Sequence, residues 1–380
     1  MEEMRGGMPI RLDNPRVWRT YLGGSRLDRL HGKKEGADGH FPEEWIMSVV
    51  AARNAGREGY KEGMSHLYGT DRTLKAFLEK DPERYLGVSK GDGDGLWGDF
   101  SLGVLVKLID SAERLTLQVH PDRQAAMELF QSPYGKTECW HILGGQPVDG
   151  EDPCIYLGFR PGVTRQHWEH LFDIQDIPGM LEAMQKFYVH PGDTILIPGG
   201  MPHAIGAGCF LAEIQEPTDL TIRVERTTPS GFPVDDLMCH QGLGFARMFD
   251  AFHYEEQSRE EIRESCFIQA VPVLETEGGK IVTHIGYGST PLFRLDEIRV
   301  EHELTLPQEM AFSGLYVLEG AGRISAEKGT VPLEKTAQFF VPAGSGALKV
   351  RAEGGKPLRI LHFWGPCKEG AAVQTGEAQP

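Results

Sequence analysis

The sequence contains no apolar run that approaches the roughly 18 residues of a membrane-spanning helix, so we expect no transmembrane segment. Its first residues, MEEMRGG, lack the apolar core of a secretion signal, so we expect no export. Only six cysteines are present, widely spaced and without a C-x-x-C pair, which argues against a disulfide framework or a structural zinc knot. We therefore expect reduced thiols and a cytoplasmic location.

Positive charge is also scarce. The chain has 39 lysines and arginines against 55 aspartates and glutamates, which gives a formal net charge of −16. A chain this acidic is a poor candidate for non-specific binding to nucleic acid or to an anionic membrane surface. An anionic small molecule could bind only in a local cationic pocket.

Glycine and proline, in contrast, are abundant, at 47 and 24 of 380 residues. They separate short segments with strand-like alternation. We expect strands over 103–109, 115–120, 138–143, 155–159, 186–189, 194–197, 209–215 and 220–224, and again over 314–324, 338–341, 348–352 and 358–364. Helical spacing is expected near 74–85, over 121–130 and 164–186, and in parts of 234–265. This pattern predicts a mainly-β protein with helical insertions.

One turn motif occurs twice. Gly192 to His203 has the form G-x5-P-x-G-x-x-H, and Pro342 to Ala347 repeats its P-x-G-x-x portion, with Ala347 in the histidine position. The complete motif resembles the second motif of the cupin superfamily, whose fold is a small jelly-roll barrel. The resemblance implies two cupin-like barrels, the second without a metal site.

Polar residues alternate with apolar residues on several of the expected strands, so they share one face of each strand. The rows are Thr116, Gln118 and His120; Lys136 and Glu138; and Asp219, Thr221 and Arg223, with His203 supplied by the turn motif. A purely structural barrel would instead turn the leucines of 115–120 inward. Two histidines, one glutamate and one glutamine form a nitrogen and oxygen site that suits Zn²⁺, and could also take Fe²⁺, Mn²⁺ or Co²⁺.

Six segments carry a more specific resemblance. They are LVKLID (105–110), LTLQVHPD (115–122), GKTECW (135–140), 198–206, LAEIQ (211–215) and 219–223. On these segments the chain resembles type I mannose-6-phosphate isomerases, also called phosphomannose isomerases. The resemblance covers roughly residues 13–365, and weaker echoes lie at Trp18, Gly23-Gly24 and Glu44-Trp45.

The resemblance implies roles for individual residues. The metal ligands would be Gln118, His120, Glu138 and His203. Thr116, Lys107 and Lys136 would contact the phosphate and sugar. Arg223 would be the active-site arginine, with Asp219 nearby. An aldose–ketose isomerase also needs a base for proton transfer, and Lys136, Glu213, Asp219 and a metal-bound water remain candidates. Lys136 could instead be a partner of Glu138 or of phosphate, and Arg223 could pair with Glu225 or Glu213.

The predicted function is the interconversion of mannose 6-phosphate and fructose 6-phosphate through a cis-enediol, with zinc or another divalent metal. Two alternatives stay open: another metal-dependent cupin enzyme, such as a dioxygenase or a different sugar-phosphate isomerase, and a non-catalytic sugar-binding cupin. The expected partner is a small phosphosugar. The protein would be a monomer or a homodimer.

The predicted organisation has five parts. Residues 1–100 form a mixed segment that completes the first barrel, and 101–230 form the metal-binding catalytic domain with its helical insert at about 164–186. A helical connector over 231–280 leads to a metal-less cupin-like domain over 281–366. The tail, 367–380, is small and polar and is expected to be frayed.

Overall fold

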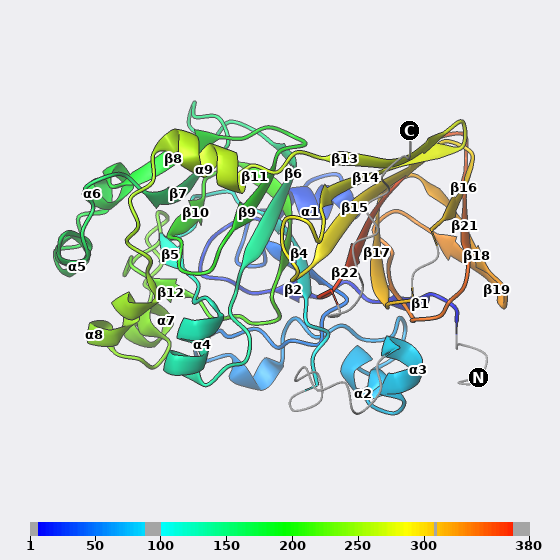
Figure 1. Cartoon of the computed structure of the whole chain (residues 1–380), viewed down its shortest axis with the longest axis horizontal. Coiled ribbons are helices and arrows are strands. Elements are labelled where there is room, and N and C mark those ends of the chain that lie inside the picture. The colour runs from blue at the N-terminus through cyan, green and yellow to red at the C-terminus, as the bar shows by residue number, and fades with distance from the viewer. Residues whose placement is uncertain (1–6, 88–99, 308–309, 368–380) are drawn as a thin grey trace, which may run out of the picture.

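The computed structural model describes residues 7–87, 100–307 and 310–367, which form four sheets flanked by short helices (Figure 1). Every pairing of neighbouring strands within these sheets is antiparallel. The prediction of a mainly-β fold is therefore confirmed. The prediction of a frayed tail over 367–380 can be compared with the structure only at Cys367, because 368–380 lie outside the described residues.

The first pair of sheets contains the segments that carry the predicted site. The six-stranded sheet runs in the order β2 (Arg16–Val17), β3 (Glu43–Ile46), β4 (Leu105–Asp110), β11 (Cys209–Gln215), β6 (Glu138–Gly145) and β9 (Thr194–Ile197). The five-stranded sheet runs β12 (Ile222–Arg223), β5 (Gln118–Val119), β10 (His203–Ile205), β7 (Cys154–Phe159) and β8 (Met184–Tyr188). Apolar side chains of both sheets, such as Trp140 and Leu157, share one buried cluster.

The second pair of sheets lies on the right of Figure 1. A seven-stranded sheet runs β1 (Ile10–Leu12), β20 (Gln338–Val341), β17 (Ser313–Glu319), β22 (Leu358–Trp364), β15 (Arg294–Val300), β14 (Gly279–Ile285) and β13 (Val271–Thr276). The four-stranded sheet runs β16 (Glu303–Leu306), β21 (Leu348–Glu353), β18 (Ala321–Ala326) and β19 (Gly329–Leu333). Their facing side chains form a single aliphatic and aromatic cluster.

A further apolar cluster joins the two pairs of sheets. Cys139 and Ile214 point out of the six-stranded sheet and share this cluster with Ile285, Leu295 and Phe363 of the seven-stranded sheet. We call the region between these two sheets the seam. Through it the two halves pack directly against each other and are not joined by a linker alone.

The helices are short and lie outside the sheets. They are α1 (Ser25–Leu30), α2 (Leu74–Leu78), α3 (Pro82–Leu86), α4 (Arg123–Phe130), α5 (Arg165–Asp173), α6 (Ile177–Glu182), α7 (Asp236–His240), α8 (Phe245–Met248) and α9 (Arg259–Cys266), with 3-10 turns η2 (Glu58–Tyr60) and η3 (Phe249–Ala251). The helix expected to open at Pro121 begins at Arg123, because the Asp122 side chain caps it by accepting from the Ala125 amide.

Several boundaries differ from expectation; the strands expected over 115–120 and 220–224, for example, are only Gln118–Val119 and Ile222–Arg223. The strand expected over 314–324 divides into β17 and β18, because Gly320 has a φ of 80° and reverses the chain. The last residues of the predicted connector form β13 and begin β14. Within the segment 1–100, β2 and β3 join the first pair of sheets but β1 pairs with β20 of the second. A three-residue strand carries too little periodicity for its partner to be predicted.

Candidate metal centre and active-site pocket

Three strands bring the predicted metal ligands together. In the five-stranded sheet, Gln118 lies between two strands and is the register partner of both His203 and Arg223. His120 follows two residues later, and Glu138 enters from the first residue of β6 in the facing sheet. All four proposed ligands are buried. Strand pairing thus gathers residues that are far apart in the sequence.

The ligand atoms lie within contact distance of one another. His120 Nε2 is 3.2 Å from Glu138 Oε2, and His203 Nε2 is 3.4 Å from Glu138 Oε1. Gln118 Nε2 is 3.3 Å from His203 Nε2. Turning the Gln118 amide by 180° would present its oxygen at the same place. His120, Glu138 and His203 form a group that can hold a metal ion.

Backbone carbonyls fix the orientation of both imidazoles. The Nδ1 atom of His120 lies 2.8 Å from the Leu220 carbonyl, and that of His203 lies 2.9 Å from the Met201 carbonyl. Because a carbonyl only accepts, each Nδ1 carries the proton and each Nε2 presents a lone pair. This is the arrangement in which a histidine ligates a metal ion.

The electrostatics of the ligands agree with this chemistry. Burial, reinforced by the Lys136 ammonium, lowers the pKa of His120 to about 3, and burial also lowers the pKa of His203. Burial alone would raise the pKa of Glu138, but Lys136 and the two histidines hold it well below its usual range. Glu138 Oε1 is buried without a hydrogen-bond partner. Two neutral imidazoles, one carboxylate and one amide fit a divalent metal ion.

Lys136 lies beside this group. Its Nζ is 2.7 Å from His120 Nε2 and forms an ion pair with Glu138 Oε2. The contact with Glu138 matches one of the two interpretations that the sequence left open. The same ammonium also faces the pocket described next.

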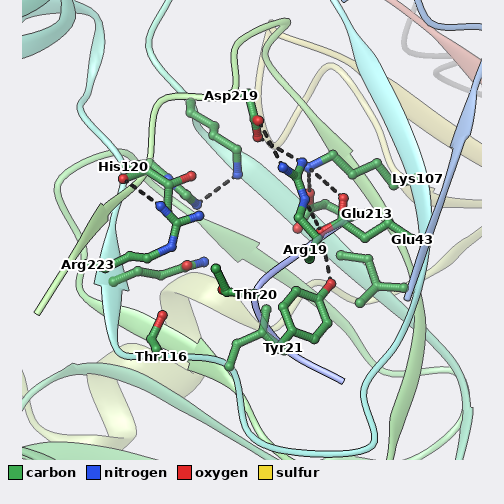
Figure 2. A pocket seen from close by; sticks show the side chains of 15 residues that line it. Arg19, Thr20, Tyr21, Glu43, Lys107, Thr116, His120, Glu213, Asp219 and Arg223 are labelled. Carbon is green, nitrogen blue, oxygen red and sulfur yellow. Dashed lines mark hydrogen bonds and ion pairs between the residues drawn. The ribbon is translucent and has the colours of Figure 1, made fainter. Parts of the chain in front are cut away.

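The predicted catalytic and substrate residues line one pocket, which Figure 2 shows from close by. Lys107, Thr116, Gln118, His120, Lys136, Glu213, Asp219 and Arg223 all contribute to its wall. Glu138 and His203 are not among the lining residues. The wall also contains Thr221, from the polar row expected over 219–223, and Arg19, Thr20, Tyr21 and Glu43, which the sequence did not single out.

Arg223 is a buried cation without an acidic partner among the described residues. Its Nη1 donates to the carbonyls of Thr221 and Met238, at 3.3 and 3.0 Å. Burial, followed by the nearby Arg19, lowers its pKa. The two acids that could have neutralised it are engaged elsewhere, since Glu225 pairs with Arg114 and Glu213 with Lys107. A buried guanidinium in this state favours an anionic ligand.

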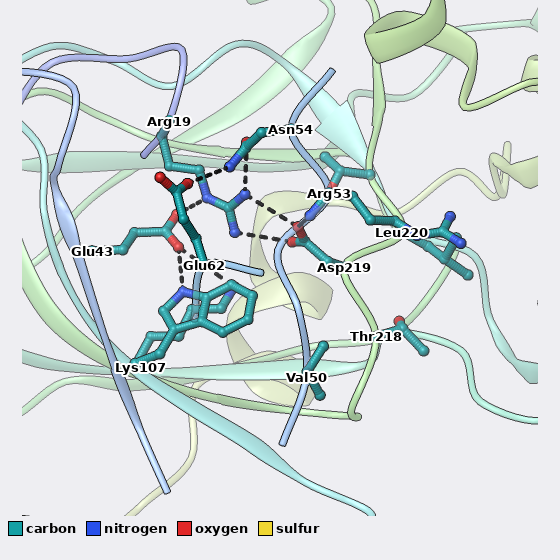
Figure 3. Close-up of polar contacts among 12 residues, drawn as sticks. Arg19, Glu43, Val50, Arg53, Asn54, Glu62, Lys107, Thr218, Asp219 and Leu220 are labelled. Atoms are coloured by element: carbon teal, nitrogen blue, oxygen red, sulfur yellow. Dashed lines mark hydrogen bonds and ion pairs between the residues drawn. The ribbon is translucent and has the colours of Figure 1, made fainter. Parts of the chain in front are cut away.

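Asp219 is held by a different arginine (Figure 3). Both of its oxygens accept from Arg19, each at 3.1 Å, and one also accepts from the Arg53 amide at 2.7 Å. Arg19 Nε makes a further ion pair with Glu43 at 2.9 Å. Burial would raise the pKa of Asp219, but Arg19 leads the charges that lower it to about 2. Both oxygens are therefore engaged and ionised at neutral pH.

Glu213 has the opposite electrostatic character. Burial, reinforced by the Glu138 carboxylate, raises its pKa. Lys107 Nζ lies 2.9 Å from one oxygen and Trp140 Nε1 donates to the other at 3.0 Å. Lys107 also lies 3.9 Å from Glu43. A carboxyl group with a raised pKa can exchange protons closer to neutral pH than an ordinary one.

The residues that sequence reasoning missed come mainly from the amino-terminal segment. Arg19, Thr20 and Tyr21 follow β2, and Glu43 opens β3. The available signal was Trp18 together with Glu44-Trp45, which echoed the family pattern next to these positions. The sequence alone could not place that segment against strands that begin only at Leu105.

Solved structures of phosphomannose isomerases share the fold of this chain. The chain has the mainly-β fold of phosphomannose isomerases: it matches the crystal structure of mannose 6-phosphate isomerase from Bacillus subtilis with a TM-score of 0.70, at 23% identity, over 93% of this chain and 99% of that one. A mannose 6-phosphate isomerase solved with zinc and yttrium matches with a TM-score of 0.64, at 15% identity, over 94% of this chain and 99% of that one.

Curated relatives with similar sequences bear the name of the same enzyme. The mannose-6-phosphate isomerase of Streptococcus mutans is 27% identical over 244 residues, 63% of this chain and 68% of the relative. Bacillus subtilis YvyI, which bears the same enzyme name provisionally, is 27% identical over 275 residues, 72% of this chain and 76% of the relative. No family model matches the chain. The resemblance inferred from the motifs is confirmed.

Among the described residues, no helix is long and apolar enough to cross a membrane. All six cysteines are free thiols, five of them buried.

Proposed function

We propose that this protein is a metal-dependent aldose–ketose isomerase that interconverts mannose 6-phosphate and fructose 6-phosphate. The observation that carries the proposal is that a His120–Glu138–His203 group adjoins, through His120, the pocket lined by Arg223, a buried cation without an acidic partner among the described residues. The first can hold a metal ion, and the second can stabilise negative charge that develops on the substrate. The relatives' names support the same reaction.

Gln118, His120, Glu138 and His203 would hold the metal. When bound, the ion supplies Lewis acidity that polarises substrate oxygens. We propose zinc, because the donor set has two imidazoles and a carboxylate, and because a structural neighbour was solved with zinc. The carbonyls of Leu220 and Met201 keep both imidazole rings in the ligating orientation.

The chain's own residues would perform the remaining work. Arg223 would stabilise the oxyanion of the cis-enediol, and Thr116, Lys107 and Lys136 would bind the phosphosugar. A base must remove the proton from C2 of the aldose and return one to C1. Glu213 is supported for this role by its raised pKa and its place in the pocket wall. Lys136 remains its rival because its ammonium lies at the same wall.

Asp219 would act as a positioning residue in this scheme. Its two oxygens are saturated by Arg19 and the Arg53 amide, so it is poorly suited to accept a proton. Instead it would hold Arg19 in the pocket wall. The expected partner is a dianionic small molecule, for which such local cations offset the acidic chain.

A coupled assay tests the proposal. Purified protein is supplied with mannose 6-phosphate, and fructose 6-phosphate is followed before chelation, after chelation and after Zn²⁺ is returned. We expect turnover, its loss and its recovery. Tight binding of the sugar without turnover would favour the sugar-binding alternative, and oxygen uptake with Fe²⁺ would favour an oxygenase.

The proton-transfer role needs a separate measurement. Glu213→Gln keeps the shape of the side chain but cannot act as a base, so kcat should fall while KM changes little. Exchange of the C2 proton with solvent deuterium should fall in parallel. Normal exchange in this variant would move the role to Lys136.

A further inference from the structure

A second group of potential metal ligands lies outside the pocket, in the seam between the two halves. It contains His141 from β6, His284 from β14 and Glu297 from β15. One ligand atom from each residue lies within 4.8 Å of those of the other two. The proposed reaction uses none of these residues.

The two faces of β6 explain how one strand serves two places. Glu138 and Trp140 point into the first pair of sheets, where they contact the predicted active-site residues. Side chains alternate along a strand, so Cys139 and His141 point the other way, toward the seam. His141 meets His284 there, with ring centroids 3.8 Å apart and ring planes at 30°.

A β-bulge aims His284 at this point. Thr283 pairs with Asp296 and Ile285 pairs with Leu295, so His284 has no register partner in β15. A bulge inserts one extra residue and redirects its side chain. In regular pairing, His284 would have a register partner in β15, and its side chain would point to the opposite face from those of its two neighbours.

His284 is buried and its ring lacks partners. It is 8% exposed, and neither Nδ1 nor Nε2 has a hydrogen-bond partner among the described residues. A buried imidazole without partners loses the hydrogen bonds that water would have provided. His141 is 1% exposed, and its Nδ1 contacts Thr194 Oγ1 at 3.0 Å. Burial lowers the pKa of both rings, so both are neutral and have lone pairs at pH 7.

Glu297 supplies the negative charge. Arg359 Nε donates to Glu297 Oε2 at 2.8 Å, and Arg359 Nη2 lies 2.7 Å from the same oxygen. The arginine thereby orients the carboxylate while both contacts fall on one oxygen. The other oxygen is left for a cation, an arrangement in which a neighbouring group positions a ligand.

We propose that His141, His284 and Glu297 form a second divalent metal site, of the zinc type, that joins the two halves of the molecule across the seam. Two imidazole nitrogens and one carboxylate oxygen are ligands that Zn²⁺ accepts, with water completing four-fold coordination. Tetrahedral zinc with nitrogen ligands places them about 3.4 Å apart. The three ligand atoms need to approach by only about 1.5 Å, which side-chain rotation can provide.

Metal content per chain tests this site separately from the proposed active centre. Protein is stripped with chelator, dialysed against Zn²⁺ and analysed for zinc and protein. We expect two zinc ions per chain in the wild type, one in His284→Phe, one in His203→Ala and none in the double variant. His284→Phe should keep isomerase turnover.

A matched control is His362→Phe on β22 of the same sheet. His362 is equally buried, but its Nε2 contacts Ser313 Oγ at 2.9 Å and it belongs to no ligand group among the described residues. Its zinc content should stay at two. If His284→Phe does not fold, Glu297→Gln serves instead, since Glu297 is partly exposed, and the second zinc ion should bind at least about tenfold more weakly.

Cobalt gives a readout that does not depend on counting. Co²⁺ bound at the seam of the His203→Ala variant should give the visible absorption of a low-coordinate nitrogen and oxygen site, and His284→Phe should abolish it. One zinc ion in both the wild type and His284→Phe would overturn the seam site and leave the active centre intact. If zinc is lost from His284→Phe but not from His203→Ala, the seam site stands and the proposed metal site of the active centre is overturned.

Discussion

The two pairs of sheets share an architecture but bury different chemistry. The interior of the second pair is a continuous cluster of aliphatic and aromatic residues, including Ile360, Val317 and Phe339. The interior of the first pair holds Glu138, Glu213 and Lys107 among its apolar side chains. The repeated turn shows the same contrast, since His203 is buried and Ala347, in the corresponding position, is exposed.

The difference separates stability from function. Burying charge costs free energy unless partners and hydrogen bonds compensate it, whereas burying aliphatic surface stabilises directly. The first pair of sheets therefore compensates its charges with pairs such as Lys107–Glu213 and Arg19–Asp219. In the second pair the buried Asp296 pairs with Arg294, but most of the interior is the apolar cluster that stabilises directly.

The largest expected effect comes from removing the histidine that distinguishes the two turns. His203→Ala should lose one metal ion per chain and at least about 10³-fold in turnover, because a metal ion supplies several kcal/mol of charge stabilisation. Metal analysis and the coupled assay measure the two losses. Ala347→His is the matched control and should change neither, since the second pair of sheets offers no matching ligands among its described residues.

Arg223→Ala should have the next largest effect. Removing one stabilising donor from an oxyanion typically costs about 10²–10³ in kcat. Metal content should stay unchanged, because the hydrogen bonds of Arg223 among the described residues go to the carbonyls of Thr221 and Met238 and not to the ligand atoms. Arg323→Ala, in an exposed ion pair of β18, serves as control. Full turnover in the Arg223 variant would remove it from the reaction.

Shortening a buried side chain should destabilise either pair of sheets, but it should lower kcat only in the first pair. Ile360→Ala in the second pair of sheets should lower the free energy of unfolding by about 2–5 kcal/mol, with kcat unchanged in the protein that stays folded. Ile195→Ala in the first pair should cost a similar amount and also reduce kcat, because Ile195 is the register partner of Trp140, which binds Glu213. Denaturant titration and the coupled assay measure both. Equal kcat in the two variants would contradict the division.

The smallest effect concerns pH. Burial, with a smaller contribution from Arg294, lowers the pKa of His362 to about 3 in the folded protein, against about 6.5 when unfolded. Between these values the unfolded chain binds the proton and the folded chain does not. Stability therefore falls as pH drops through this window, by up to about 1.4 kcal/mol per pH unit for one histidine.

His362→Phe tests this directly. The variant should show a shallower loss of stability than the wild type between pH 6.5 and 4.5 in denaturant titrations. The variant keeps a residual slope because His120 and His141, which it retains, are buried in the same way. Identical slopes in the two proteins would mean that His362 is protonated in the folded state.

The polar residues that the sequence singled out lie together in the structure, whereas much of the chain around them could not be placed from the sequence. Alternation within 115–120 and 219–223 identified the inward polar rows, since a strand's period of two is written directly into its residues. The isolated glutamate and histidine followed from short motifs. Arg19 and Glu43 did not, because their segment carries no repeating pattern that reveals which strands it contacts.

The strands of the second half show the same limit. Gln338–Val341 and Leu358–Trp364 have the bounds expected from their apolar runs. β13 was missed because its side chains are largely exposed and its sequence, VPVLET, contains a proline. The seam site was also invisible, because a bulge sets the direction of His284 and a bulge depends on pairing between strands.

The strand β1 has a consequence for how the protein is made. Asn14, just after β1, donates to the carbonyl of Thr336, 322 positions later, and β1 itself pairs with β20. At about 5–20 residues per second, a ribosome delivers that partner tens of seconds after β1 emerges. The nascent chain must keep an apolar strand without its neighbour for that time, which makes the amino terminus a natural site for a chaperone to hold during synthesis.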